Sequence, residues 1–124
     1  MWEALFWLYA VNATLLIIHE IDSAYWKEWE LFKLPGGITG FLLLHLPMVF
    51  IILWGARLVD HHMSMGVVIS LILALAGLFA FSIHTYFLRK GRGEFNTLMS
   101  KALLNATLLV SLAQLVVSAY LLAT

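Results

Sequence analysis

Five residues of this chain form the set best placed for metal or acid–base chemistry. They are His19, Glu20, Asp22, His45 and His84. Three imidazoles and one carboxylate can supply a tetrahedral ligand set for zinc, or part of a coordination shell for iron, manganese or copper. A divalent metal would then be bound by His19, Asp22, His45 and His84. Glu20 would act as general base toward a metal-bound water.

The composition indicates the environment of these residues. Of 124 residues, 63% are hydrophobic and 11% are charged, and the mean hydropathy is +0.96. These values indicate an integral membrane protein, because a soluble domain of this size is far less apolar. Lys plus Arg and Asp plus Glu both number 7, so net charge does not favour nucleic acid as a partner. The absence of cysteine excludes disulfides, thiolate metal sites and cysteine nucleophiles.

Four hydrophobic stretches are each long enough to cross a hydrocarbon core of about 30 Å as a helix. They run roughly from Trp2 to Tyr25, Ile38 to Val59, Gly66 to Leu88 and Ala102 to Leu122. The first stretch lacks a basic start and a small-residue cleavage pattern, so we expect it to stay in the mature protein. The sequence therefore predicts an all-α membrane protein, a four-transmembrane-helix up-down bundle forming a single domain over residues 1–124.

Alternating helix direction would bring the five residues to one membrane face, here called side A, the side on which the first span ends. His19, Glu20 and Asp22 end the first span, His45 lies near the start of the second, and His84 ends the third. Ionisable groups inside the hydrocarbon cost roughly 2.5–3.5 kcal/mol each and usually face a bundle interior or a water-filled cavity. A shared polar cluster is therefore predicted near side A.

Helical spacing predicts which side chains turn inward. His19 and Asp22 share a face at i, i+3, and Asn12 lies seven residues before His19 on the same stripe. A stripe of small residues in the third span leads to His84 and would let helices approach closely: Gly66, Ser70, Gly77 and Ala80. The fourth span has two polar faces. Asn105 lies at the membrane depth of the cluster, so we expect it to face the cluster. The other polar face consists of Thr107, Ser111, Gln114 and Ser118.

Basic residues are concentrated on side A. Arg57 alone lies near the opposite face, whereas side A has Lys27, Lys33, Arg89, Lys90, Arg92 and Lys101. The positive-inside rule then predicts that side A is cytoplasmic and that both termini are on the periplasmic or exterior side, in a bacterial inner membrane. The segment from Trp26 to Gly37 mixes aromatic and charged residues and ends in Pro-Gly-Gly, which is typical of an interfacial amphipathic turn.

Three functions fit these observations, and the sequence leaves them open. The first is a metal-dependent enzyme or metal-binding protein acting on a lipophilic molecule. The second is a non-catalytic accessory subunit of a larger membrane complex, or a homo-oligomer, in which the cluster is a structural network and Asp22 pairs with Lys27 or Arg89. The third is a heme- or pigment-binding electron-transfer subunit, because His45 and His84 could provide two axial ligands at matched depth.

One stretch of the sequence also carries a resemblance. The residues from His19 to Gly37 read H-E-I-D-S-A-Y-W-K-E-W-E-L-F-K-L-P-G-G. They resemble a group of small bacterial four-span membrane proteins of unknown function that carry a similar stretch. The chain is also loosely similar to the membrane family named for its H-x-x-E-E motif, with Asp22 and Ser23 in place of the two glutamates. Both resemblances imply a four-span topology and a polar site near the end of the first span.

Overall fold

The computed structural model describes residues 1–124, and all its regular elements are helices. They are α1 (Trp2–Tyr25), α2 (Glu28–Leu31), α3 (Gly37–Asp60), α4 (Ser64–Arg89) and α5 (Leu98–Ala123). All except the short α2 are long and apolar enough to cross a membrane. The predicted four-transmembrane-helix bundle is confirmed. Helix α5 begins one turn earlier than the sequence predicted, because Thr97 caps it by accepting a hydrogen bond from the Ser100 amide.

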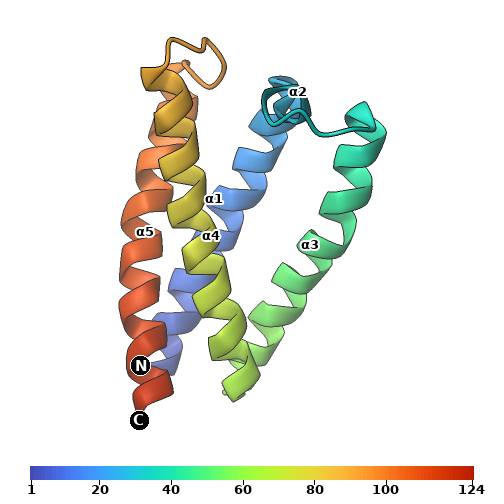
Figure 1. The fold of residues 1–124 in the computed structure, drawn as a ribbon. Helices are drawn as coiled ribbons and strands as arrows, with labels where there is room; N and C mark the ends of the chain where they lie inside the picture. The colour runs from blue at the N-terminus through green and yellow to red at the C-terminus, as the bar shows by residue number, and fades with distance from the viewer.

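The four long helices run alternately up and down. Both termini therefore lie at one end of the molecule, while α2 and the α4–α5 connection lie at the other (Figure 1). Helix α4 packs along α5, and α1 packs against α3, α4 and α5. Helix α3 contacts α1 and α4 but not α5. The core is thus formed by α1, α4 and α5, with α3 attached along one side.

The small-residue stripe of α4 faces the interior, as its spacing predicted. Gly66, Ser70, Gly77 and Ala80 are all buried, and so is His84 at the end of the stripe. A Cβ atom at Gly77 would overlap the Ser111 side chain of α5. The missing side chains thus let α4 approach its neighbours closely.

A chain of buried polar side chains joins α1, α4 and α5 near the middle of the bundle. Asn12 Nδ2 donates to Gln114 Oε1 at 2.6 Å and to Ser111 Oγ at 3.1 Å. Gln114 Nε2 donates to Ser70 Oγ at 2.8 Å and to the Ser70 carbonyl oxygen at 3.1 Å. Ser70 Oγ also lies 2.9 Å from Ser118 Oγ. Because water is absent at this depth, the polar groups satisfy one another and fix how the three helices pack.

This network corrects one expectation about α5. Asn105 was expected to face the polar cluster, but its side chain is exposed. The inward face is instead the other polar stripe, Thr107, Ser111, Gln114 and Ser118, whose members are all buried. Depth was the wrong criterion, since Ser111, Gln114 and Ser118 would lose their hydrogen-bond partners if this face were placed against lipid.

Helix α3 is buried only near its C-terminal end, at Gly55, Leu58 and Val59. Just before these residues, Tyr9 Oη donates a hydrogen bond of 2.7 Å to the carbonyl oxygen of Ile52. Toward its N-terminus, α3 leans away from α4 (Figure 1). The two helices therefore diverge toward the end of the bundle that carries α2, and a cavity lies between them there.

Candidate ligand-binding site

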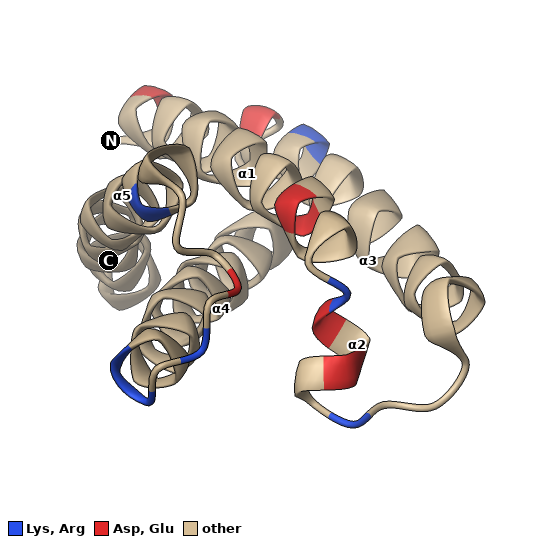
Figure 2. Cartoon of the chain, turned by 90° about the horizontal axis from the view of Figure 1, so that it is seen from above, with Lys and Arg blue, Asp and Glu red and all other residues tan.

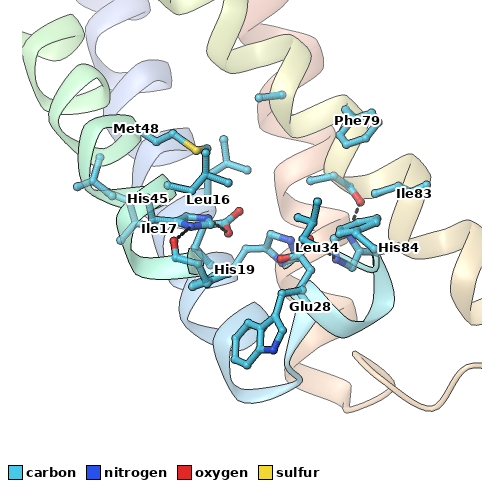
Figure 3. Close-up of a pocket in the computed structure, with 18 of the residues that line it drawn as sticks. Leu16, Ile17, His19, Glu28, Leu34, His45, Met48, Phe79, Ile83 and His84 are labelled. Atoms are coloured by element: carbon cyan, nitrogen blue, oxygen red, sulfur yellow. Dashed lines mark hydrogen bonds and ion pairs between the residues drawn. The ribbon is translucent and has the colours of Figure 1, made fainter. Parts of the chain in front are cut away.

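The cavity has a volume of about 470 Å³ and is here called the side-A cavity. Its walls come from α1, α2, the α2–α3 connection, α3 and α4, and 15 of its 22 lining residues are hydrophobic. The polar lining residues with ionisable side chains are His19, Glu20, Glu28, His45 and His84. Figure 3 shows His45 on the α3 side, His84 on the α4 side, and His19 between them. The site thus combines apolar walls with one polar end.

The first polar pair in this cavity joins α1 to α3. His45 Nε2 lies 2.6 Å from Glu20 Oε2, and His45 Nδ1 lies 2.7 Å from the Phe41 carbonyl oxygen. A carbonyl oxygen only accepts, so Nδ1 carries a hydrogen and donates it. The short contact at Nε2 then needs one more proton, either on the imidazole or on the carboxyl group. This Glu20–His45 pair therefore shares one exchangeable proton.

The second polar group lies on α4 and α2. His84 lines the cavity, and its Nδ1 donates to the Ala80 carbonyl oxygen at 2.7 Å, which leaves Nε2 as the other ring nitrogen. The nearest carboxylate oxygen, Glu28 Oε1, is 3.5 Å from Nε2. That distance is too long for a good hydrogen bond, and Nε2 is buried with no hydrogen-bond partner. His84 therefore presents a buried, unpaired nitrogen beside a carboxylate.

His19 completes this group from α1. Its ring meets the His84 ring edge-on, with 4.5 Å between centroids. Its side chain is 1% exposed, and its Nδ1 atom is buried without a hydrogen-bond partner. Two neighbouring imidazoles thus have unused nitrogens in the same buried region, which is unusual for polar atoms that no water reaches.

The α4–α5 connection covers this group. Phe95 is 1% exposed, and its ring lies 4.2 Å from the His84 centroid and 5.7 Å from the His19 centroid. Its backbone adopts φ +63°, a left-handed conformation that is rare for a residue with a bulky side chain. The apolar ring therefore folds back under the connection and separates the two imidazoles from the solvent on side A.

Glu28 is the ionisable member of the site that lies outside the spans. Burial raises the pKa of its carboxyl group, but the neighbouring His84 and Ser23 side chains together lower it by more, and His19 adds to this effect. The net pKa of Glu28 lies below its ordinary value of 4.5. Glu28 is therefore a carboxylate at neutral pH.

This shift predicts how stability depends on pH. A carboxyl group whose pKa is lower in the folded state stabilises the fold above its unfolded pKa, and the stabilisation is lost as the pH falls through the folded pKa. The stability difference between wild type and Glu28→Gln should thus be constant above about pH 5 and shrink below the ordinary value of 4.5. Thermal unfolding in detergent between about pH 3 and 7 measures it. Glu30→Gln, an exposed change in the same short helix, should keep the wild-type profile; an identical profile for both variants would contradict the role given to Glu28.

Four of the five residues singled out at the start line the side-A cavity: His19, Glu20, His45 and His84. Asp22 does not line it; its Oδ1 accepts a hydrogen bond of 3.0 Å from Trp26 Nε1, and its Oδ2 is buried without a hydrogen-bond partner. Asn12 is buried on the His19 stripe but belongs to the network at the middle of the bundle.

No group of three or more His, Asp or Glu side chains is arranged to hold a metal ion. The four-ligand metal site stays a prediction.

Sequence analysis missed two residues of the site, Glu28 and Phe95. Glu28 lies in a segment that the charge pattern marks as interfacial, and nothing local indicates that it turns back toward His84. Phe95 did carry a signal, because it is a lone aromatic residue in the connection Arg-Lys-Gly-Arg-Gly-Glu-Phe-Asn. A large apolar side chain in a charged, glycine-rich loop near a membrane often packs against the core.

The fold and the cavity define a small four-span membrane protein with a partly polar cavity opening near one membrane face. The chain belongs to the family of unknown function DUF6713, whose family model matches residues 5–121. Comparisons with curated proteins and with solved structures gave no match. The cavity is therefore the feature of this chain that bears on function.

Proposed function

We propose that this protein binds a lipophilic molecule that carries a polar group, in the side-A cavity. The observation that carries this proposal is the composition of the cavity, with apolar walls from α3 and α4 and two glutamate–histidine groups at one end. Its volume of about 470 Å³ lies within the range of roughly 300–1,000 Å³ typical of small-molecule sites. A molecule with a hydrocarbon part and a polar head matches both regions.

The cavity is open sideways, toward the lipid. Phe79 of α4 and Leu44 and Met48 of α3 line it, and their side chains are 64%, 53% and 42% exposed. Residues that both line a cavity and reach the outer surface mark its mouth. Because α3 and α4 are membrane spans, that mouth faces hydrocarbon, and a lipophilic molecule could enter from the bilayer without crossing water.

The Glu20–His45 pair gives the site a capacity for acid–base chemistry. The pair holds one exchangeable proton within a largely apolar cavity, so it can give a proton to, or take one from, the polar group of a bound molecule. Glu20 would be the general base in this step. Whether or not turnover follows, the pair would position the polar group by hydrogen bonding.

Blocking the cavity tests this proposal directly. Ala76 lines the cavity wall on α4, so Ala76→Phe would fill space that a ligand needs. Ala102→Phe on α5 is a matched control, since Ala102 is exposed and away from the cavity. Binding of dodecanol to protein in nonionic detergent, followed by native mass spectrometry, should show one molecule on the wild type and on Ala102→Phe and at least tenfold less on Ala76→Phe. Equal occupancy of the two variants would refute the cavity as the binding site.

Metal-dependent chemistry is a second candidate, supported by the histidine geometry. His45 and His84 both line the cavity and donate from Nδ1 to a backbone carbonyl oxygen, which leaves Nε2 as the ring nitrogen that a metal would need. Metal-binding histidines are usually held in this way. Metal analysis of the purified protein, with His45→Ala and His84→Ala, would test it; unchanged metal content in both variants would exclude these ligands. An absorption spectrum of the same sample, with or without a Soret band, would test the heme interpretation.

We infer that the cavity lies in the cytoplasmic half of a bacterial inner membrane. Lysine and arginine residues cluster in the connections at the end that carries α2, around α2 and between α4 and α5 (Figure 2). Such a bias favours a cytoplasmic position for that end. Because the chain has no cysteine, a single cysteine at Lys90 or at Thr124 can be labelled specifically. An impermeant maleimide added to intact cells should label the second and not the first.

A further inference from the structure

The ionisable residues that line the side-A cavity are carboxylates and histidines. Among the 22 lining residues the carboxylates are Glu20 and Glu28, and none is lysine or arginine. Three histidines complete the ionisable set, His19 and His84 beside Glu28, and His45 beside Glu20. We propose that the ligand is a cationic amphiphile, a molecule with one hydrocarbon chain and a protonated amine head that lies beside His84 and Glu28. This inference rests on the proposed function and names its ligand class.

The unpaired atoms at the polar end select a hydrogen-bond donor. His84 donates through Nδ1 to Ala80, so in the neutral ring Nε2 is an acceptor, and it has no partner. Glu28 Oε1, the other acceptor, is 3.5 Å away. An ammonium group has three N–H donors and no acceptor, so one group placed beside both atoms can donate to each. The head would thus satisfy a nitrogen that the protein itself leaves unpaired.

The negative charge of Glu28 also favours a cationic head group. Glu28 is a carboxylate at neutral pH, its neighbours are the Ser23 hydroxyl and the imidazoles of His84 and His19, and no lysine or arginine lines the cavity beside it. A buried charge is stable only when it is paired. An ammonium head would supply a positive charge beside Glu28, a hydroxyl head would supply one hydrogen bond but no charge, and a carboxylate head would add a second negative charge.

Aromatic rings around the polar end also suit a cation. Trp29 of α2, Phe32 of the α2–α3 connection and Phe41 of α3 also line the cavity, with Phe32 beside His84 and Phe41 beside Trp29 and His45. The faces of such rings attract ammonium groups, most strongly when water is excluded. Phe41 already stacks on the His45 ring, with 3.9 Å between centroids. The ligand head would therefore meet carboxylates and ring faces together.

The test compares three ligands that have the same hydrocarbon chain and differ only in the polar head group. Dodecylamine, dodecanol and dodecanoic acid are titrated into wild-type protein in nonionic detergent at neutral pH, with binding to Ala76→Phe subtracted to remove partition into the micelle. The amine is expected to bind at least tenfold more tightly than the alcohol, and the acid more weakly than the alcohol. If the acid or the alcohol binds as well as the amine, the proposal of a cationic ligand is refuted, but the cavity remains supported as the binding site. If no probe binds above the Ala76→Phe level, the proposed function fails as well.

Two variants then locate the head. Glu28→Gln should remove the preference for dodecylamine over dodecanol while leaving dodecanol binding within about threefold of wild type, because the hydrocarbon walls are unchanged. Glu30→Gln, on the exposed side of the same helix, should keep the wild-type preference. Retention of the full preference in Glu28→Gln would overturn the placement beside this carboxylate. The wild-type comparison of the three heads decides the ligand class even if Glu28→Gln is unstable.

Discussion

Replacing Phe95 with alanine is expected to lower the free energy of unfolding by about 3–5 kcal/mol, the usual cost of truncating a fully buried phenylalanine. The ring is 1% exposed and lies against both His84 and His19. Its removal would leave a void and would let water reach two imidazoles that are now shielded. Unfolding by a denaturing detergent in mixed micelles measures the change.

Two further variants make this prediction specific. Phe79→Ala removes the same ring from a position that is 64% exposed, so it should cost less than about 1 kcal/mol. Phe95→Gly loses the same ring as Phe95→Ala but tolerates the left-handed backbone at φ +63°, so it should be about 1 kcal/mol more stable than the alanine variant. Similar losses for Phe95→Ala and Phe79→Ala would show that Phe95 does not cover the core.

Much of the fold follows from local sequence patterns. Four long apolar stretches specify four spans, and their alternating direction puts His19, His45 and His84 at one depth. The stripe of small residues on α4 correctly predicts that His84 faces inward, because close packing requires that face to be buried. These features depend on helical periodicity and on membrane thickness, both of which a single sequence encodes.

The parts of the site that sequence analysis missed depend on tertiary structure. Glu28 reaches His84 only because α2 folds back over the end of the bundle, and Phe95 reaches the imidazoles only because its connection takes a left-handed turn. The position of α3 was likewise not predictable, since most of its sequence is apolar and does not show which half leaves the core. The cavity exists because of that divergence.

Asp22 illustrates a local contact that overrides a plausible longer-range one. Spacing put it on the His19 face, and its carboxylate was a candidate metal ligand. In the structure Trp26, four residues later and directly after the end of α1, donates to its Oδ1 atom. A partner at i+4 needs no tertiary arrangement, so it competes effectively with a ligand that depends on three helices meeting.

The buried network at the middle of the bundle gives the second large expected effect. Gln114→Ala would remove three hydrogen bonds, one from Asn12 and two to Ser70, and would leave a cavity where the amide was. Hydrogen bonds between membrane helices contribute about 0.6 kcal/mol each on average and up to about 1.7. With the lost packing, we expect the free energy of unfolding to fall by about 2–3 kcal/mol.

Matched changes on the same helix separate this network from a general effect of losing a polar residue. Ser118→Ala removes a single hydrogen bond to Ser70 and should cost about 1 kcal/mol or less. Asn105→Ala, at an exposed position, should change stability by less than about 0.5 kcal/mol. If Asn105→Ala proved as damaging as Gln114→Ala, α5 would have to be rotated so that its other polar face points inward. The ranking Gln114, Ser118, Asn105 therefore tests the orientation of α5 about its own axis, on which the packing of α1 against α4 depends.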